Sequence, residues 1–283
     1  MRFIDLEELD RTRPEIVEAL NALQEARDTV TAEPDPVRRR QLIERYQPRW
    51  AALRPYLSEL SFNKCWYLEC INPGTDDDID HFRPKSGVAE EPVHPGYYWL
   101  ALDWRNFRLS CHRANRPRTD PNTHETGGKA AHFPLVGAST RAFSPEDNLN
   151  LEFPGLLDPT DPMDPRFISF TANGEAVLSP EYRESEEAER RFEYSRLYLH
   201  LNWPRFTDDR VVLYNIVLKY IERGQAEAPT RFDAGASQGF RNTIKDLRKL
   251  MLPSSPYSSA ATIFIESFRY VWWVNDIVLR GPR

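Results

Sequence analysis

A carboxylate and an imidazole stand side by side at Asp80 and His81. Histidine has an ordinary pKa close to neutrality, so a neutral imidazole here can accept a proton from an attacking water molecule. Five of the six histidines and all three cysteines lie between residues 65 and 132. Metal or acid–base chemistry is therefore expected in this part of the chain.

Two asparagines follow this pair along the chain. Asn106 comes 25 residues after His81, and Asn115 comes nine residues after Asn106. The carboxylate of Asp80 and the amide oxygen of Asn115 are hard oxygen ligands of the kind that Mg²⁺ or Mn²⁺ accepts, and further coordination positions stay open to water and a phosphate. Such an ion neutralises charge on a leaving oxygen while His81 activates water. This chemistry breaks phosphodiester bonds.

Other polar side chains in the same region have two interpretations each. The basic residues can pair with the phosphates of DNA or form a solvated loop; they are Arg83, Lys85, Arg116 and Lys129. Three further histidines are candidate metal ligands or proton donors, with a surface or structural role as the alternative; they are His112, His124 and His132.

The elements that must hold these residues are short. Ile79, Asp80 and His81 end a strand-like segment, which Pro84 prevents from continuing. Residues 107–110 alternate like a second strand. Residues 61–137 are otherwise dense in Gly, Pro, Asn and Asp and show no long periodic helix. Catalytic residues often lie on such irregular segments when a rigid scaffold supports them.

Helical patterns flank this region on both sides. Residues 6–60 have apolar positions at helical spacing; Pro14 suits a first helical turn, and Pro48 is expected to split or kink the second helix. Residues 167–178 predict a β-hairpin that turns at Asn173-Gly174. Beyond Pro180 we expect four helical segments, of which the last is rich in aromatic residues and is expected to be core.

Composition limits the class of protein. With 283 residues, 40% hydrophobic and 28% charged, the chain is globular and wholesale disorder is excluded. No apolar run approaches the roughly 20 residues that span a bilayer, so no membrane association is expected. Three cysteines are too few for a disulfide framework and favour the cytoplasm. The net charge is −6, although 31 of the 37 basic residues are arginine.

The residues singled out above resemble the HNH, or ββα-metal, endonucleases. Three stretches carry the resemblance: DHFRPKS, YYWLALDWRNFRLSCHRANR and KAAHFPL. The sequences of these stretches are similar to those of the HNH nucleases of Septu-type anti-phage systems and of some retron-associated systems. In those systems the nuclease forms a complex with an ATPase of the ABC/OLD type. The resemblance is strong over residues 64–135 and says little about residues 1–60 or the C-terminal helices.

The resemblance implies a role for each matching residue. His81 would be the general base, and Asn106 would pin the loop that carries it. Asp80 and Asn115 would bind Mg²⁺ or Mn²⁺. The substrate would be DNA, and the protein partner would be the ATPase. If Asn115 opens the short helix of that family, Pro117 must lie in its first turn.

One departure from the family concerns zinc. Many HNH proteins hold a structural Zn²⁺ with two Cys-x-x-Cys pairs, but here only Cys65 and Cys111 occupy those positions, with Leu68 and Ala114 in place of the second cysteines. Two thiolates cannot complete a tetrahedral site. Cys70 and His112 are unusual replacements, so we expect no structural zinc and apolar packing instead.

The sequence therefore predicts an α+β protein with an HNH ββα-metal core between mainly helical segments. The expected regions are 1–60 (helical), 61–137 (nuclease core), 138–180 (Pro-rich connection and hairpin) and 181–283 (helical). The expected function is a metal-dependent DNA endonuclease subunit of a bacterial defence complex, since a charge of −6 argues against a free-standing DNA binder. The alternatives are an inactive interaction subunit with the HNH fold and an RNA-cleaving nuclease.

Overall fold

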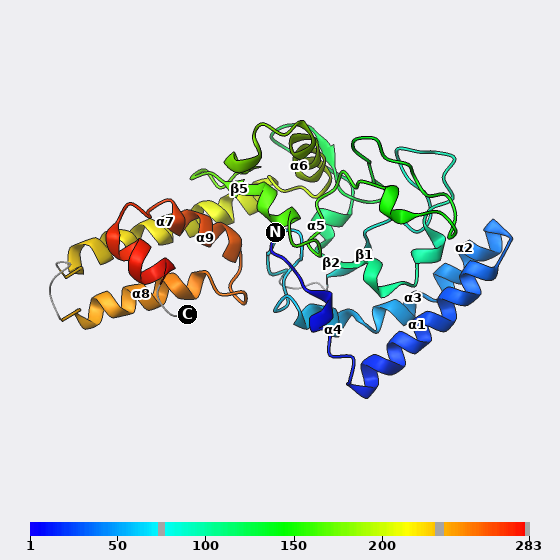
Figure 1. Ribbon diagram of the computed structural model, residues 1–283, viewed down its shortest axis with the longest axis horizontal. Coiled ribbons are helices and arrows are strands. Elements are labelled where there is room, and N and C mark those ends of the chain that lie inside the picture. Colours follow the sequence, from blue (N-terminus) through cyan, green and yellow to red (C-terminus); the bar gives the residue numbers. More distant parts are fainter. Residues whose placement is uncertain (73–76, 230–234, 281–283) are drawn as a thin grey trace.

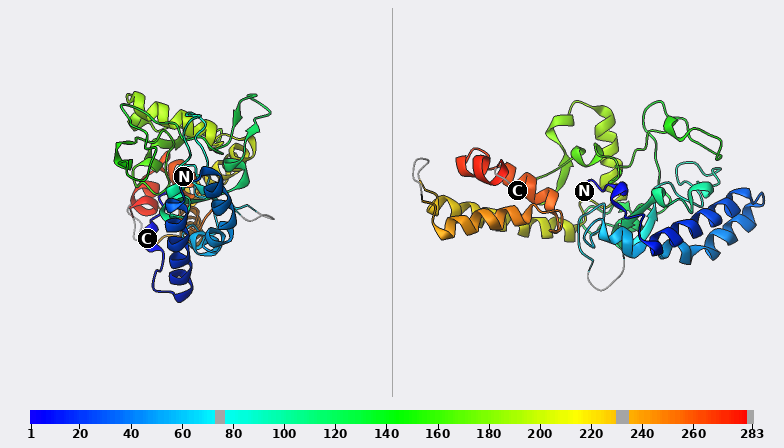
Figure 2. Two further views of the ribbon diagram at one scale, coloured as in Figure 1. Left: turned by 90° about the vertical axis from the view of Figure 1, so that its right-hand side faces the viewer. Right: turned by 60° about the horizontal axis from the view of Figure 1, so that its bottom comes forward.

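The computed structural model describes residues 1–72, 77–229 and 235–280. The molecule is elongated, with helical regions at its two ends and a mixed region between them (Figure 1). The right-hand view in Figure 2 shows the same order along the long axis. Within the described residues, the strands form two-stranded antiparallel sheets in the middle region. The predicted α+β organisation is confirmed at this level.

The N-terminal helices are α1 (Pro14–Ala32), α2 (Pro36–Arg45), α3 (Gln47–Ala51) and α4 (Arg54–Glu59). Helix α1 begins at Pro14, as predicted. Proline suits a first helical position because it has no backbone N–H group, and such a group would have no acceptor within the helix there. Asp35 caps α2 by accepting a hydrogen bond of 2.8 Å from the backbone amide of Val37. Pro48 lies in the first turn of α3, which confirms the predicted break in the second helix.

The middle region is built on β1 (Asp78–His81) and β2 (Phe107–Ser110), which pair antiparallel with His81 opposite Phe107. Helix α5 (His112–Asn115) follows β2 directly. All four residues of β2 are buried, so its alternating sequence does not reflect one exposed face. Short 3₁₀ helices lie at Leu6–Glu8, Tyr98–Leu100, Trp104–Asn106, Leu149–Leu151, Asp164–Phe167 and Pro180–Tyr182.

The position of Asn115 differs from the expected one. It is the last residue of α5 rather than the first residue of a helix. Pro117 follows the helix, and the next residues form a two-stranded sheet of β3 (Arg118–Thr119) and β4 (Thr126–Gly127). Proline cannot supply the amide that would continue a helix, which explains why the chain leaves the helical conformation here.

The hairpin of β1 and β2 lies between two hydrophobic cores. Phe107 and Leu109 of β2 pack with the N-terminal helices, in a cluster that includes Ile16, Leu23 and Leu53. Ala114 of α5 belongs instead to a cluster with the C-terminal helices. Because both sides are packed, the backbone of β1, β2 and α5 has little freedom to move.

The second hairpin joins β5 (Ile168–Phe170) and β6 (Ala176–Leu178), as predicted. Its turn differs in detail, since Gly174 takes a positive φ of 75° but Asn173 does not. The loop is closed by a hydrogen bond of 2.9 Å from the amide of Thr171 to the carbonyl of Glu175. It is therefore longer than a two-residue turn, and only its glycine needs the left-handed conformation.

The C-terminal region contains α6 (Glu186–Tyr198), α7 (Pro204–Glu227), α8 (Gln238–Leu250), α9 (Ser258–Glu266) and a π-helical segment, Val274–Leu279. The last predicted helix is thus interrupted after Glu266. Its aromatic residues are divided: Phe264 and Trp273 are buried, whereas Tyr270 is 78% exposed. Among the described helices, none combines the length and apolar character that a bilayer span requires.

Candidate active site

The hairpin and the helix after it bring three predicted site residues to one pocket. Asp80 and His81 end β1, and Asn115 ends α5. All three line a pocket of about 260 Å³ together with Lys85. We call it the active-site pocket. Asn106 is not among its lining residues and lies at the end of a 3₁₀ helix, immediately before β2.

His81 is held in one orientation by its surroundings. Its Nε2 lies 2.9 Å from the carbonyl oxygen of Ala101, and its ring meets the rings of Trp50 and Phe107 in edge contacts at centroid distances of 5.3 and 5.2 Å. A carbonyl only accepts, so Nε2 carries the proton and Nδ1 is the basic nitrogen. Burial, followed by the charge of Lys85, holds the pKa of His81 well below its ordinary value. The imidazole is therefore neutral near pH 7 and ready to accept a proton.

Asn106 fastens the chain just beyond β1. Its Oδ1 accepts a hydrogen bond of 2.8 Å from the amide of Arg83, and its Nδ2 donates to the carbonyls of Arg83 at 3.0 Å and Leu100 at 3.2 Å. The side chain is buried. Three bonds from one amide group fix the segment that follows His81 relative to the segment that precedes β2. This geometry is the one that a loop-pinning role requires.

We expect Asn106→Ala to lower kcat by on the order of 100-fold with little change in KM, because a displacement of about 1 Å at a catalytic group has an effect of that size. Asn106→Asp keeps the acceptor for the amide of Arg83 but places a carboxylate oxygen against the carbonyls of Arg83 and Leu100, so its kcat should be no higher than that of Asn106→Ala. Steady-state cleavage kinetics measure this split. A rise in KM with unchanged kcat would show that Asn106 does not position the base.

Asp80 is buried in a network with Tyr67 and Lys129. Its Oδ2 accepts a hydrogen bond of 2.7 Å from the Tyr67 hydroxyl, and its Oδ1 lies 3.0 Å from Nζ of Lys129. Lys129 is fully buried and also donates to the carbonyl of His81 at 2.6 Å. Lys129 thus ties the side chain of Asp80 to the backbone of His81. It lies inside the site, although its sequence context suggested a phosphate contact.

The donors in the pocket fit a hard divalent cation in part. Each oxygen of the Asp80 carboxylate has lone pairs beyond those that Tyr67 and Lys129 use. Asn115 donates from Nδ2 to Oδ2 of Asp78 at 3.3 Å, which leaves its Oδ1 for a cation. A carboxylate and an amide oxygen are ligands of the type that Mg²⁺ takes alongside several waters. The ammonium of Lys129 weakens the attraction of Asp80 for such an ion.

The four predicted phosphate-binding residues have different surroundings. The Nε of Arg83 forms an ion pair of 2.7 Å with the buried Glu152, so its guanidinium is directed into the fold. Lys85 lines the active-site pocket, with Nζ 5.6 Å from the centroid of the Trp50 ring. Arg116 is more exposed and lies 3.6 Å from Asp78. Lys85 and Arg116 remain accessible to a substrate, whereas the charged groups of Arg83 and Lys129 form their contacts inside the fold.

The other predicted histidines form contacts of their own. Nε2 of His112 lies 3.2 Å from Asp78, and Nδ1 of His132 lies 2.9 Å from Glu90, with its ring stacked on Tyr198. These contacts fit the structural and surface interpretation of both residues. Asp78 is a residue that sequence reasoning missed. It lies two positions before Asp80, and period-two alternation along β1 places both on the same face of the strand.

The three cysteines lie closer together than expected. The Sγ atoms of Cys65, Cys70 and Cys111 are all buried and lie within 4.8 Å of one another. Hydrogen bonds from the thiols of Cys65 and then Cys70 lower the pKa of Cys111. Leu68 and Ala114 are buried as predicted, but Cys70 adds a third ligand that its spacing argued against. The cluster could bind a metal ion such as zinc through its three thiolates.

We expect purified protein to contain about one zinc ion per chain, bound by these thiolates. Cys70→Ser should lower the zinc content and the Tm together, because metal binding stabilises only the folded state. Ser110→Ala is the matched control, since Ser110 is buried beside Cys111 and is not part of the cluster. Elemental analysis and thermal unfolding measure both quantities. Zinc-free wild-type protein, or equal zinc in both variants, would contradict the assignment.

Comparison with known proteins supports part of the predicted resemblance. No protein-family model matches this chain. The Septu protein PtuB of Bacillus mycoides (strain KBAB4) is 32% identical to it over 128 residues. The match covers 44% of this chain and 40% of that protein, so it spans less than half of either sequence. Over that part of its length, the chain is a distant homologue of a Septu protein, while the HNH assignment stays a prediction.

Proposed function

We propose that this chain is an HNH-type endonuclease that cleaves the phosphodiester bonds of DNA with the help of Mg²⁺ or Mn²⁺. One observation carries the proposal: His81, whose Nε2 is bonded to the carbonyl of Ala101 and whose Nδ1 is left as the basic nitrogen, lines the pocket that also contains Asp80 and Asn115. A base, two hard oxygen donors and a lysine at one pocket are the groups that hydrolysis of a phosphodiester needs.

Three residues at or beside the pocket have separate roles in the proposed reaction. Nδ1 of His81 accepts a proton from the water that attacks phosphorus, while the bond from Nε2 to Ala101 keeps the ring in the correct tautomer. Asn106 holds the segment after His81 in place. Lys85 lines the pocket and would pair with an oxygen of the phosphate.

Asp80 and Asn115 would hold the metal ion. When bound, the ion would act as a Lewis acid that offsets negative charge on the phosphate and on the leaving oxygen. Lys129 keeps the Asp80 carboxylate in a single orientation, and Asp78 does the same for the amide of Asn115. The ligands are therefore preorganised by neighbours that do not touch the substrate.

We further propose that the chain acts as a subunit of an anti-phage complex with an ATPase partner. The similarity to a Septu protein supports the defence role. The net charge of −6 supports the partner, because a protein of this charge has little long-range attraction for DNA. The partner would contribute part of the affinity for DNA.

Cleavage assays test the proposed function directly. Plasmid DNA and an RNA of matched length are incubated with the full chain, alone and with the proposed ATPase partner, in the presence of Mg²⁺, Mn²⁺ or EDTA. We expect metal-dependent nicking of DNA that EDTA abolishes. Cleavage of RNA alone would assign the site to a ribonuclease, and absence of cleavage under every condition would favour an inactive interaction subunit.

A further inference from the structure

Two further pockets adjoin the active-site pocket. The first, of about 440 Å³, lies between α2 and residues 85–98, and the second, of about 410 Å³, lies between α2–α4 and the hairpin of β1 and β2. We call them the α2 pocket and the hairpin pocket. Lys85 and Ser86 line both of them and also the active-site pocket. The three pockets therefore share one wall, and we refer to them together as the groove.

The groove has a charge opposite to that of the whole protein. Its α2 and hairpin pockets are lined by basic side chains of Arg39, Arg40, Arg54, Lys85 and Arg116. The acidic residues that line the groove are Glu44, Asp78 and, in the active-site pocket, Asp80, so the basic residues are in excess. The chain as a whole carries −6, so this local excess of positive charge is not a consequence of composition. A positively charged groove with low-dielectric walls attracts a polyanion.

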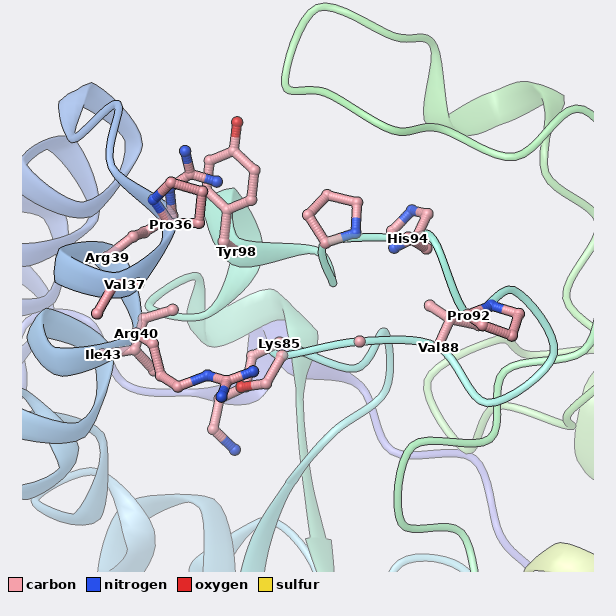
Figure 3. A pocket seen from close by; sticks show the side chains of 13 residues that line it. Pro36, Val37, Arg39, Arg40, Ile43, Lys85, Val88, Pro92, His94 and Tyr98 are labelled. Carbon is pink, nitrogen blue, oxygen red and sulfur yellow. The ribbon is translucent and has the colours of Figure 1, made fainter.

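The α2 pocket adds an aromatic surface to this charge. The guanidinium of Arg39 lies 3.6 Å from the centroid of the Tyr98 ring, and it donates hydrogen bonds to the backbone carbonyls of Glu33 and Pro34. Arg40 is exposed at the same pocket. Figure 3 shows Arg39 of α2 beside Tyr98, Arg40 extending toward Lys85, and His94 on the far side of the pocket. Stacked aromatic and guanidinium groups beside further cations are how proteins hold single nucleic-acid strands.

We propose that the groove holds one strand of the DNA substrate along its whole length, with the scissile phosphate at the active-site pocket. This proposal rests on the proposed function. Arg39 and Arg40 contact phosphates on one side of the cut and Tyr98 supports a base, while Arg116 contacts a phosphate on the other side. The N-terminal helices are thus part of the substrate-binding surface as well as a scaffold for the hairpin.

The geometry of α2 provides a matched pair of variants. At about 100° per residue, Arg39, Arg40 and Ile43 share the face that lines the pocket, while Arg38 and Arg45 lie on the opposite face. Neither Arg38 nor Arg45 lines the α2 pocket or the hairpin pocket. The double variants Arg39→Ala/Arg40→Ala and Arg38→Ala/Arg45→Ala remove equal charge from one helix, but only the first removes it from the groove.

Binding of a fluorescent single-stranded DNA is measured with the full-length chain in EDTA, so that no cleavage occurs. We expect the Arg39→Ala/Arg40→Ala variant to bind at least about tenfold more weakly, because two charge-assisted contacts are lost. The slope of log K against log salt should become shallower by about 1.4, the value for two phosphates of a single strand. The Arg38→Ala/Arg45→Ala variant should bind like wild type.

Tyr98 is tested separately. Tyr98→Ala should weaken binding by about tenfold, the effect of losing one stacked base, whereas Tyr98→Phe keeps the ring and should bind normally. Equal losses in the two double variants, no loss in either, no binding by wild type at low salt, or losses confined to a duplex probe would each overturn the proposal.

The outcome is independent of catalysis. A chain that binds through the groove but never cleaves would refute the proposed function and leave the groove intact. If the wild-type chain cleaves DNA but the Arg39→Ala/Arg40→Ala variant binds single-stranded DNA with unaltered affinity, the groove proposal is refuted and the proposed function stands.

Discussion

Replacing His81 by glutamine is expected to lower the rate of DNA cleavage by about 10²–10⁴-fold, the range for loss of a general base. The glutamine amide reaches the position of Nε2 and can still donate to the carbonyl of Ala101, so the fold and the binding of oligonucleotides in EDTA should be preserved. Single-turnover cleavage measures the chemical step, and fluorescence anisotropy measures binding. Unchanged cleavage by the folded variant would remove His81 from the catalytic machinery.

The pH dependence gives an independent check on the same residue. Burial and then Lys85 hold the pKa of His81 well below its ordinary value of 6.5. The base is therefore already unprotonated at neutral pH, and the cleavage rate of wild type should not fall as the pH decreases from 8 to about 6.5. An apparent pKa at or above 6.5 for loss of activity on acidification would fail to support the buried base.

The lowered pKa of His81 should also make the free energy of unfolding depend on pH, in a direction that can be worked out. In the unfolded chain His81 takes up a proton below about pH 6.5, whereas in the folded protein its lowered pKa prevents this. The unfolded state then binds more protons, so the free energy of unfolding decreases as the pH falls from about 6.5 toward the folded pKa. His81→Gln should show a weaker decrease over this interval. Denaturant unfolding at a series of pH values measures the difference.

Features of the fold that depend on neighbouring residues could be predicted from the sequence. Pro14 and Pro48 mark a helix start and a helix break because proline lacks an amide proton, whatever the tertiary context. Gly174 marks a hairpin turn for a similarly local reason. The interruption after Glu266 was not predicted, because the apolar pattern continues through it and burial of Trp273 depends on packing against distant helices.

The candidate site also combines residues that the sequence could predict with contacts that it could not. The order Asp80, His81, Asn106 and Asn115 could be recognised because each residue lies on or next to a short element of one hairpin-helix unit. The partners of these residues could not, because they come from far along the chain. Lys129 meets Asp80 across 49 residues, and Glu152 meets Arg83 across 69. Neither contact has a local pattern that sequence reasoning could use.

The cysteine cluster adds a backbone reason. Cys70 reaches Cys65 because the chain reverses at Glu69, which takes a left-handed φ of 55°. The amide of Cys65 then donates to the carbonyl of Cys70 at 3.0 Å. A non-glycine residue seldom adopts this conformation, so the spacing of Cys65 and Cys70 alone argued against a shared site. The buried carboxylate of Glu69 accepts hydrogen bonds from Ser258 and Ser259, and these contacts hold the reversal.

Lys129→Met is expected to lower the free energy of unfolding by about 3–5 kcal/mol, because removing one member of a buried ion pair leaves the other charge without compensation. Lys129 is fully buried, and its ammonium serves both Asp80 and the carbonyl of His81. Lys245→Met removes an exposed lysine and should change stability by less than about 0.5 kcal/mol. Urea unfolding of each variant provides the comparison.

A double-mutant cycle separates the ion pair from simple loss of packing. In Asp80→Asn/Lys129→Met the buried carboxylate is gone as well, so the double variant should be more stable than Lys129→Met alone, despite carrying one more substitution. The side-chain amide that replaces the carboxylate can still accept the hydrogen bond from Tyr67. Additive effects within about 0.5 kcal/mol would show that Lys129 stabilises the fold without compensating the charge of Asp80. Coupling would show that the charge of the proposed metal ligand is balanced within the fold, so that a divalent ion must compete with an ammonium group for this carboxylate.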